Sequence, residues 1–189
     1  FFAPKERYIW ALVLDRAGTL YAGTGERGVI YKIDRNGNGQ VLVDTEETHV
    51  VSLAIDPSGN LIAGTDPNGR VYRISPTGAL SVLYDTPLRE IRSLLIDKTG
   101  TLYAGAVDVP RRREGAPRQD EVAVSEATPG SAETGSVGTI EITADGGDDS
   151  AARRQRSGGG GVVYQITPDG DAREWWRSRE DVCFTLGLD

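Results

Sequence analysis

The stretch Asp15-Arg-Ala-Gly-Thr-Leu-Tyr-Ala-Gly-Thr24 is repeated twice further along the chain. The second copy is Asp56-Pro-Ser-Gly-Asn-Leu-Ile-Ala-Gly-Thr65, and the third is Asp97-Lys-Thr-Gly-Thr-Leu-Tyr-Ala-Gly105. Each copy begins 41 residues after the one before it. A fixed period of this length is the sequence signature of a protein built from stacked structural repeats.

A second block follows the same period. Gly28-Val-Ile-Tyr-Lys-Ile33 matches Gly69-Arg-Val-Tyr-Arg-Ile74 after a shift of 41 residues. The third copy, Gly161-Val-Val-Tyr-Gln-Ile166, begins 92 residues after the second, which is 51 residues more than one period. We therefore expect an insertion in the third repeat, after Gly105.

Each repeat predicts four short β-strands. In the second repeat they cover residues 50–55, 60–64, 70–74 and 80–84, where apolar and β-branched residues cluster or alternate with polar ones. The connections have a short polar residue at the first corner and Gly at the fourth, as in Ser75-Pro-Thr-Gly78, which type I turns favour. Four antiparallel strands in a unit of about 40 to 45 residues indicate the blade of a β-propeller.

The repeats resemble a broad family of bacterial propellers, which includes the NHL-repeat, the gluconolactonase-like (SMP-type) and the two-component-regulator-type propellers. The resemblance rests on the Asp-x-x-Gly-x-Leu-Tyr-Ala-Gly-Thr and Gly-x-Val-Tyr-x-Ile patterns, and it covers nearly all of the chain outside the insertion. It implies an all-β fold of about three blades plus the first strand of a fourth. Such an arc is an incomplete ring, so we expect a fragment of a longer protein. The resemblance also implies an extracytoplasmic bacterial location, periplasmic or secreted.

The repeat divides the chain into three segments. Residues 1–105 hold the first two blades and half of the third, 106–160 form the insertion, and 161–189 hold the rest of the third blade and the first strand of a fourth. The insertion is rich in Pro, Gly, Ser, Ala, Glu and Arg and has no aromatic residue. Such a segment buries too little apolar surface to offset the entropy of ordering, so we expect it to be disordered.

Composition narrows the range of partners. The 189 residues include 21 Lys and Arg and 28 Asp and Glu, which gives a formal net charge of −7. Because non-specific nucleic-acid binding depends on a basic surface, we expect no nucleic-acid partner. No apolar run is long enough to span a bilayer, so we also expect no membrane insertion. The single cysteine, Cys183, excludes an internal disulfide and a cysteine-based zinc site, and it reads as a buried apolar residue.

The repeat also indicates where a ligand would bind. Ligands of propellers gather at the mouth of the central channel, at residues just before each innermost strand. The period places four residues there: Tyr8, His49, Glu90 and Val182. We expect ligand contacts from Tyr8, His49, Glu90 and the neighbouring Asp181. His49 is the only histidine, and it could also hold a divalent metal together with four nearby carboxylates, those of Glu46, Glu47, Glu180 and Asp181.

The recurring Asp, Gly and Tyr residues are explained by blade structure, which leaves no set of catalytic residues. We therefore expect a non-enzymatic recognition or scaffold module that binds a protein or a small ligand, with a sensor domain as one form of it. No cofactor is expected, although a divalent cation stays open. The alternative is a metal-dependent lactonase, another hydrolase or a lyase of the gluconolactonase-like type.

Overall fold

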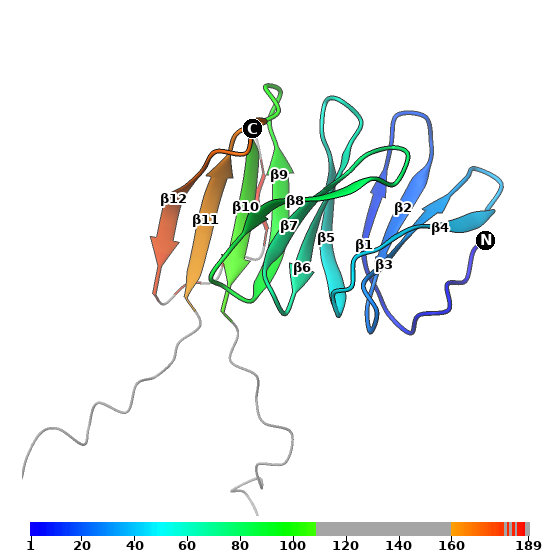
Figure 1. Ribbon diagram of the computed structural model, residues 1–189, viewed down its shortest axis with the longest axis horizontal. Helices are drawn as coiled ribbons and strands as arrows, with labels where there is room; N and C mark the ends of the chain where they lie inside the picture. The colour runs from blue at the N-terminus through cyan, green and yellow to red at the C-terminus, as the bar shows by residue number, and fades with distance from the viewer. Residues whose placement is uncertain (109–159, 180, 182, 184, 188–189) are drawn as a thin grey trace, which may run out of the picture. The chain divides into compact units, whose positions relative to one another are not determined.

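The computed structural model describes residues 1–108, 160–179, 181, 183 and 185–187. All regular elements in these ranges are β-strands, and they form three antiparallel sheets of four strands each (Figure 1). This confirms the predicted propeller blades. The predicted disordered insertion lies outside the described residues except at its two ends. Within the described ranges, no helix is long and apolar enough to cross a membrane.

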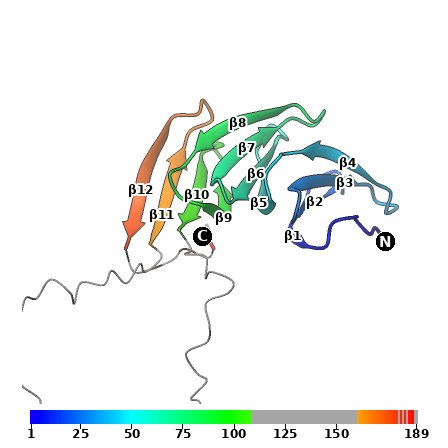
Figure 2. The ribbon, with the colours of Figure 1, turned by 60° about the horizontal axis from the view of Figure 1, so that its bottom comes forward.

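Each blade is one sheet, in which strands next to each other in the chain pair with each other. The strands of the first blade are β1 (Ile9–Leu14), β2 (Leu20–Thr24), β3 (Val29–Ile33) and β4 (Gly39–Asp44). Those of the second are β5 (His49–Ile55), β6 (Leu61–Asp66), β7 (Arg70–Ile74) and β8 (Leu80–Asp85). Those of the third are β9 (Glu90–Ile96), β10 (Leu102–Val107), β11 (Gly161–Ile166) and β12 (Ala172–Ser178). The sheets follow one another in an arc with β1, β5 and β9 on its inner side (Figure 2).

Aspartate turns close the first hairpin of every blade, as predicted. Asp15, Asp56 and Asp97 each accept the backbone N–H of the residue four positions later, at 2.7 to 2.9 Å. The glycine three positions after each aspartate has a φ between 82° and 87°. An L side chain is strained at such an angle, so glycine is the residue that fits this corner.

The third blade is complete although its second and third strands are far apart in the chain. β10 and β11 pair without a register shift from Leu102 opposite Ile166 to Val107 opposite Gly161. Residues 108–160 therefore connect two strands that are direct neighbours in one sheet. They leave that sheet at the end where Glu90 pairs with Val107.

One residue of each innermost strand is left out of the pairing. These residues are Trp10 in β1, Val51 in β5 and Arg92 in β9, and they are 41 positions apart. Each forms a β-bulge, which bends the strand and redirects the side chain of the extra residue. The three blades therefore present different side chains, Trp, Val and Arg, from the same backbone feature.

Neighbouring blades make close contact at a glycine of the second strand. The three equivalent glycines are Gly23, Gly64 and Gly105. A Cβ added to Gly23 would lie 2.7 Å from Cγ1 of Val50, and one added to Gly64 would lie 2.5 Å from Cγ2 of Ile91. At Gly105 the neighbouring side chain is that of Cys183, which is half-buried. A Cβ added to Gly105 would lie 3.3 Å from its Sγ. The absence of a side chain at these glycines lets the innermost strand of the next blade approach.

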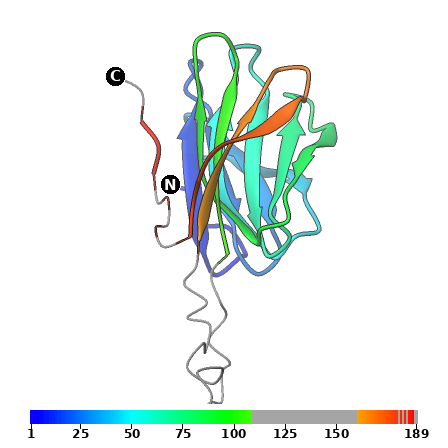
Figure 3. The same ribbon diagram turned by 90° about the vertical axis from the view of Figure 1, so that its left-hand side faces the viewer.

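Figure 3 shows the three sheets one behind another. Two apolar clusters fill the spaces between them. The cluster between the first and second blades contains Tyr21, Ile30, Val50, Leu61, Ala63, Tyr72 and Ile74. The cluster between the second and third contains Ile62, Val71, Ile91, Leu102, Ala104, Ala106, Val162, Tyr164 and Ile166. The core is therefore made by blade against blade, as in other repeat proteins, in which each unit contacts its neighbours.

Candidate functional site

Three of the predicted site residues lie at the same end of their sheets. The carbonyl of Tyr8 accepts the N–H of Gly25 at 2.9 Å, at the connection between β2 and β3. His49 pairs with Asp66 and Glu90 pairs with Val107, so both stand beside the corresponding connection of their own blades. The repeat therefore places Tyr8, His49 and Glu90 at one mouth of the inner side of the arc.

Two of these residues are joined by a tryptophan. The rings of Tyr8 and Trp10 are stacked with centroids 5.6 Å apart, and the ring of Trp10 meets that of His49 edge-on at 5.7 Å. Tyr8 is 41% exposed and Trp10 is 52% exposed. We call Tyr8, Trp10 and His49 the aromatic cluster. It is a solvent-accessible surface of three rings contributed by two blades.

The β2–β3 connection fixes the orientation of His49. Nδ1 of His49 accepts the backbone N–H of Glu26 at 3.3 Å, so the neutral ring carries its proton on Nε2 and can donate it to a ligand. Glu26 has a φ of 73°, a strained value for a residue with a side chain. A Cβ at Gly25 would collide with Nε1 of Trp10 and lie 2.8 Å from Nδ1 of His49. Glycine is therefore needed there for this cluster to form.

Glu90 forms an ion pair with Arg92, a residue of the same strand, β9. Arg92 donates to it twice, from Nε and from Nη2, each at 2.9 Å. The side chain of Glu90 is 15% exposed and that of Arg92 is 31% exposed. This forked ion pair gives the third blade a charged surface where the first blade has an aromatic one.

Asp181 is a local partner of the end of β12. Its backbone N–H donates to Oγ of Ser178 at 2.9 Å, and the Ser178 hydroxyl donates to Oδ2 of Asp181 at 3.0 Å. Asp181 is exposed. Its two neighbours, Glu180 and Val182, lie outside the described residues, so their predicted places at the mouth stay predictions.

Glu47 does not face the mouth. It is 4% exposed, and its carboxylate accepts three hydrogen bonds from the second blade. Asn68 donates to Oε2 at 2.8 Å, while Arg70 and Tyr72 each donate to Oε1 at 3.1 Å. Burial, opposed by Arg70 and assisted by the charge of Glu47, raises the pKa of the Tyr72 phenol. One of the four carboxylates that the sequence offered to a metal, that of Glu47, is thus occupied within the fold.

Few side chains that could bind a metal ion lie close together in the described residues. In the part of the chain that the structure describes, no three or more His, Cys, Asp or Glu side chains come close enough together to hold a metal ion. His49 has aromatic and backbone neighbours, and Glu90 faces a guanidinium. The arrangement suits stacking and hydrogen bonding to a ligand better than metal coordination.

Sequence reasoning missed Trp10 and Arg92. Both are bulge residues, and each stands two positions after a predicted residue, Tyr8 or Glu90. The sequence did contain a sign of these residues. Positions 10, 51 and 92 are equivalent in the repeat, each 41 residues after the one before it, yet they hold Trp, Val and Arg. A repeat position that does not keep its residue type is the place to look for function.

Comparisons with known proteins establish the fold. No family model matches the chain, and no curated protein does. A streptogramin B lyase has a TM-score of 0.54 and 10% identity over 92% of this chain and 42% of its own. Virginiamycin B lyase from Staphylococcus aureus has a TM-score of 0.51 and 12% identity, over 88% and 40%. A gluconolactonase-like protein has a TM-score of 0.50 and 14% identity, over 89% and 49%.

These are β-propeller proteins, and the likeness confirms the predicted fold class and the broad resemblance to bacterial propellers. The chain spans less than half the length of each of the three. Extracellular domains of signalling systems from Bacteroides thetaiotaomicron show a weaker likeness, with TM-scores of 0.42 to 0.45. Propellers of this fold thus include enzymes, the two lyases among them.

Proposed function

We propose that this chain is a recognition module, and that its ligand binds at the aromatic cluster. The observation that carries the proposal is the exposure of Trp10, stacked on Tyr8 and contacted by His49 at the mouth of the inner side. Large aromatic side chains left partly in water are unfavourable unless something covers them, and Trp and Tyr dominate the energetics of binding surfaces.

The backbone around the cluster supports a binding role. Gly25 and the strained Glu26 hold the ring of His49 in one orientation and leave its Nε2 as a fixed donor. A preorganised donor beside a flat apolar surface gives both orientation and affinity, because little side-chain freedom is lost on binding. Glu90 and Arg92 add a charged pair at the same end of the third blade.

The test selects linear peptides from a phage-displayed library on the immobilised full chain and measures their affinity by calorimetry. We expect at least a tenfold loss of affinity in Trp10→Ala and His49→Gln. Trp175→Ala is the matched control, because Trp175 is 60% exposed on β12, away from the cluster. Equal losses in Trp10→Ala and Trp175→Ala would show that selection found sticky surface tryptophans and not a site.

The enzymatic alternative is tested in parallel. A metal-dependent lactonase or lyase would bind Ca²⁺ or Zn²⁺ in calorimetry and turn over members of a lactone panel. Our proposal expects neither, since Glu47 is committed to Asn68, Arg70 and Tyr72. Metal binding that disappears in His49→Gln would replace the recognition proposal with the enzymatic one. An extracytoplasmic location belongs to the same proposal and is checked by cell fractionation.

A further inference from the structure

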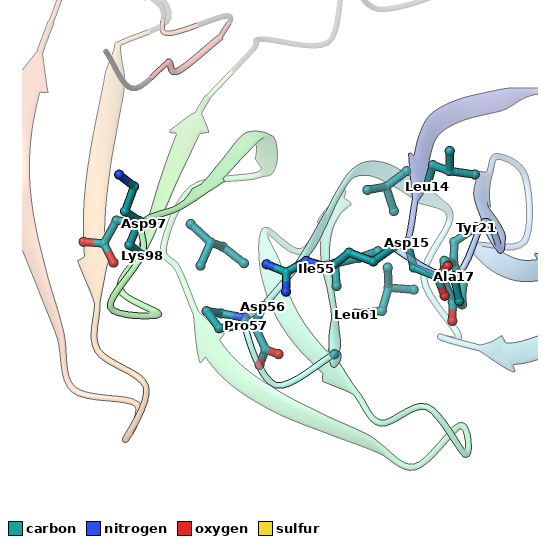
Figure 4. A pocket seen from close by; sticks show the side chains of 14 residues that line it. Leu14, Asp15, Ala17, Tyr21, Ile55, Asp56, Pro57, Leu61, Asp97 and Lys98 are labelled. Atoms are coloured by element: carbon teal, nitrogen blue, oxygen red, sulfur yellow. The ribbon is translucent and has the colours of Figure 1, made fainter.

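A cavity of about 720 Å³ lies where the three innermost strands end, at the first turn of each blade (Figure 4). Leu14, Ile55 and Ile96, the last residues of these strands, give it an apolar wall. The three turn aspartates and two exposed cations, Arg16 and Lys98, line it as well. Charges of both signs are spread over three blades there, so they select no one class of ligand.

A second cavity, beside the first blade, has a more specific lining. Its volume is about 370 Å³, within the range of about 300 to 1,000 Å³ that is usual for small-molecule sites. Five of its lining residues have counterparts 41 positions later that form one polar network in the second blade. The five are Glu6, Arg27, Val29, Tyr31 and Asp44, and their counterparts are Glu47, Asn68, Arg70, Tyr72 and Asp85.

In the second blade, this network surrounds one guanidinium group. Arg70 donates from Nη1 to Oε1 of Glu47 at 3.1 Å and from Nε to Oδ2 of Asp85 at 3.2 Å. Asn68 donates to Oε2 of Glu47 at 2.8 Å, so both oxygens of that carboxylate have donors. Two carboxylates thus share one planar cation, whose several N–H groups can donate in different directions.

The first blade keeps the two carboxylates and the tyrosine but lacks that cation. Val29 stands in the place of Arg70 and has no side-chain donor. Arg27, in the place of Asn68, donates to Asp44 at 3.2 Å. Oε2 of Glu6 is buried and has no hydrogen-bond partner among the described residues. An unpaired buried carboxylate oxygen is unfavourable, so a donor that reached it would be bound favourably.

The charges around this cavity are balanced in number. Its acidic residues are Glu6 and Asp44, and its basic residues are Lys5 and Arg27. The pair of Arg27 and Asp44 is open to water, with side chains 68% and 43% exposed, so a ligand can compete for Asp44 at little cost. Lys5 is exposed and forms no ion pair with another residue that the structure describes. Attraction of a cation therefore depends on the unpaired oxygen of Glu6 and not on net charge.

We propose that this cavity binds an alkylguanidinium group between Glu6 and Asp44, as the second blade holds Arg70 between the equivalent carboxylates. The guanidinium would supply the donor that Oε2 of Glu6 lacks, and the alkyl chain would lie against Phe2 and Val29, which line the same cavity. The cavity shares no lining residue with the aromatic cluster, so this site is independent of the function proposed above.

The experiment compares three probes that share a four-carbon chain: butylguanidinium, butylammonium and butylurea. Nuclear magnetic resonance titration of the full chain, labelled with ¹⁵N, measures their affinities. We expect butylguanidinium to bind most tightly and butylurea most weakly. Butylammonium has the charge without the planar fork, and butylurea has the planar shape without the charge.

Substitutions test which residues hold the probe. Glu6→Gln should weaken butylguanidinium by at least about tenfold and leave butylurea unchanged, because it removes the charge and keeps the shape of the side chain. Glu46→Gln is the matched control, because Glu46 is an exposed carboxylate outside the cavity. Arg27→Asn, which copies the second blade, should strengthen binding because it frees Asp44. Val29→Arg should abolish binding, because the chain then supplies its own guanidinium.

A free alkylguanidinium and an arginine side chain of a partner protein share this chemistry. Tighter binding of the peptide acetyl-Gly-Arg-Gly-amide than of butylguanidinium would assign the site to a partner's arginine, and equal or weaker binding to the free compound. Equal affinity for the three probes, equal weakening by Glu6→Gln and Glu46→Gln, or no butylguanidinium binding in the millimolar range would overturn the inference.

Discussion

The phenol of Tyr72 donates to the buried carboxylate of Glu47 at 3.1 Å, which ties the strand β7 to the segment that enters its own blade. The first blade has the same pair of residue types, since burial and then the neighbouring carboxylate of Glu6 raise the pKa of Tyr31. The third blade has Leu88 at the equivalent position, packed against the cluster that contains Tyr164. There the hydroxyl of Tyr164 is buried without a hydrogen-bond partner in the described structure.

Glu47→Leu should destabilise the chain by about 1 to 3 kcal/mol, because it leaves the buried hydroxyl of Tyr72 without its acceptor. Tyr72→Phe alone should cost about 1 kcal/mol, and the double variant should cost less than the sum of the two. Urea unfolding gives the free energy of unfolding for the two single variants and for the double variant. Glu46→Gln, an exposed neighbour, is the control and should change it by less than about 0.5 kcal/mol. Additive losses would contradict the pairing.

Tyr164→Phe should be neutral or stabilising by up to about 1 kcal/mol, because it removes a buried hydroxyl that has no partner. The same substitution therefore has opposite signs at Tyr72 and Tyr164, two equivalent positions of the repeat. Urea unfolding of both variants under one condition gives the comparison. A loss at Tyr164 as large as the loss at Tyr72 would mean that its hydroxyl is satisfied in solution.

Gly64→Ala should destabilise the chain by about 1 to 3 kcal/mol, because the new Cβ would collide with Oγ of Ser52 and lie 2.5 Å from Cγ2 of Ile91. In an Ile91→Ala background the added cost should shrink in part, since Cγ2 of Ile91 is gone while Oγ of Ser52 and the Cβ at position 91 remain. Gly187→Ala is the control, because nothing lies within 4 Å of a Cβ there. Thermal unfolding followed by circular dichroism is sufficient. An undiminished cost in the Ile91→Ala background would rule out this contact as the cause.

Asp97→Asn should lower stability near neutral pH, and the difference from the natural chain should narrow as the pH falls toward 3. The Thr99 hydroxyl, aided by backbone amides of the turn, holds the pKa of Asp97 below its usual value. A folded-state pKa below the unfolded value of about 3.9 gives stability that is present above that pH and is lost as pH falls through the folded-state pKa.

Urea midpoints between pH 7 and pH 3 measure this effect. Asp169→Asn in the last turn of the third blade is the control, because its carboxylate makes no hydrogen bond to a described residue. A difference between Asp97→Asn and the natural chain that does not change with pH would mean that the carboxylate itself contributes nothing.

The fold followed from the sequence because the repeat shows the same interaction several times. One Asp-x-x-Gly turn is a weak signal, but Asp15, Asp56 and Asp97 at equal spacing fix both the hairpins and their order. Local chemistry alone, the acceptance of turn amides by a carboxylate, was enough to predict these elements. The contact of Val50 with Gly23 is long-range, and sequence reasoning gave its residues but not their pairing.

The candidate site was predictable only in part. The period located Tyr8, His49 and Glu90 at one end of the blades, but the rings and ions that they meet depend on bulges that the alternation of residues does not reveal. Glu47 was misread as an available ligand for a different reason. Its partners Asn68, Arg70 and Tyr72 lie more than 20 positions away, and burial by tertiary packing left no local trace.

The bulge in the innermost strands makes this scaffold suitable for diversification. Trp10, Val51 and Arg92 show that the backbone accepts an aromatic, a branched aliphatic or a charged side chain at this position without a change in strand register elsewhere. A library randomised at these three codons would vary what the inner side of the arc displays while leaving the glycine contacts and turns untouched. New binding specificities could then be sought without redesigning the core.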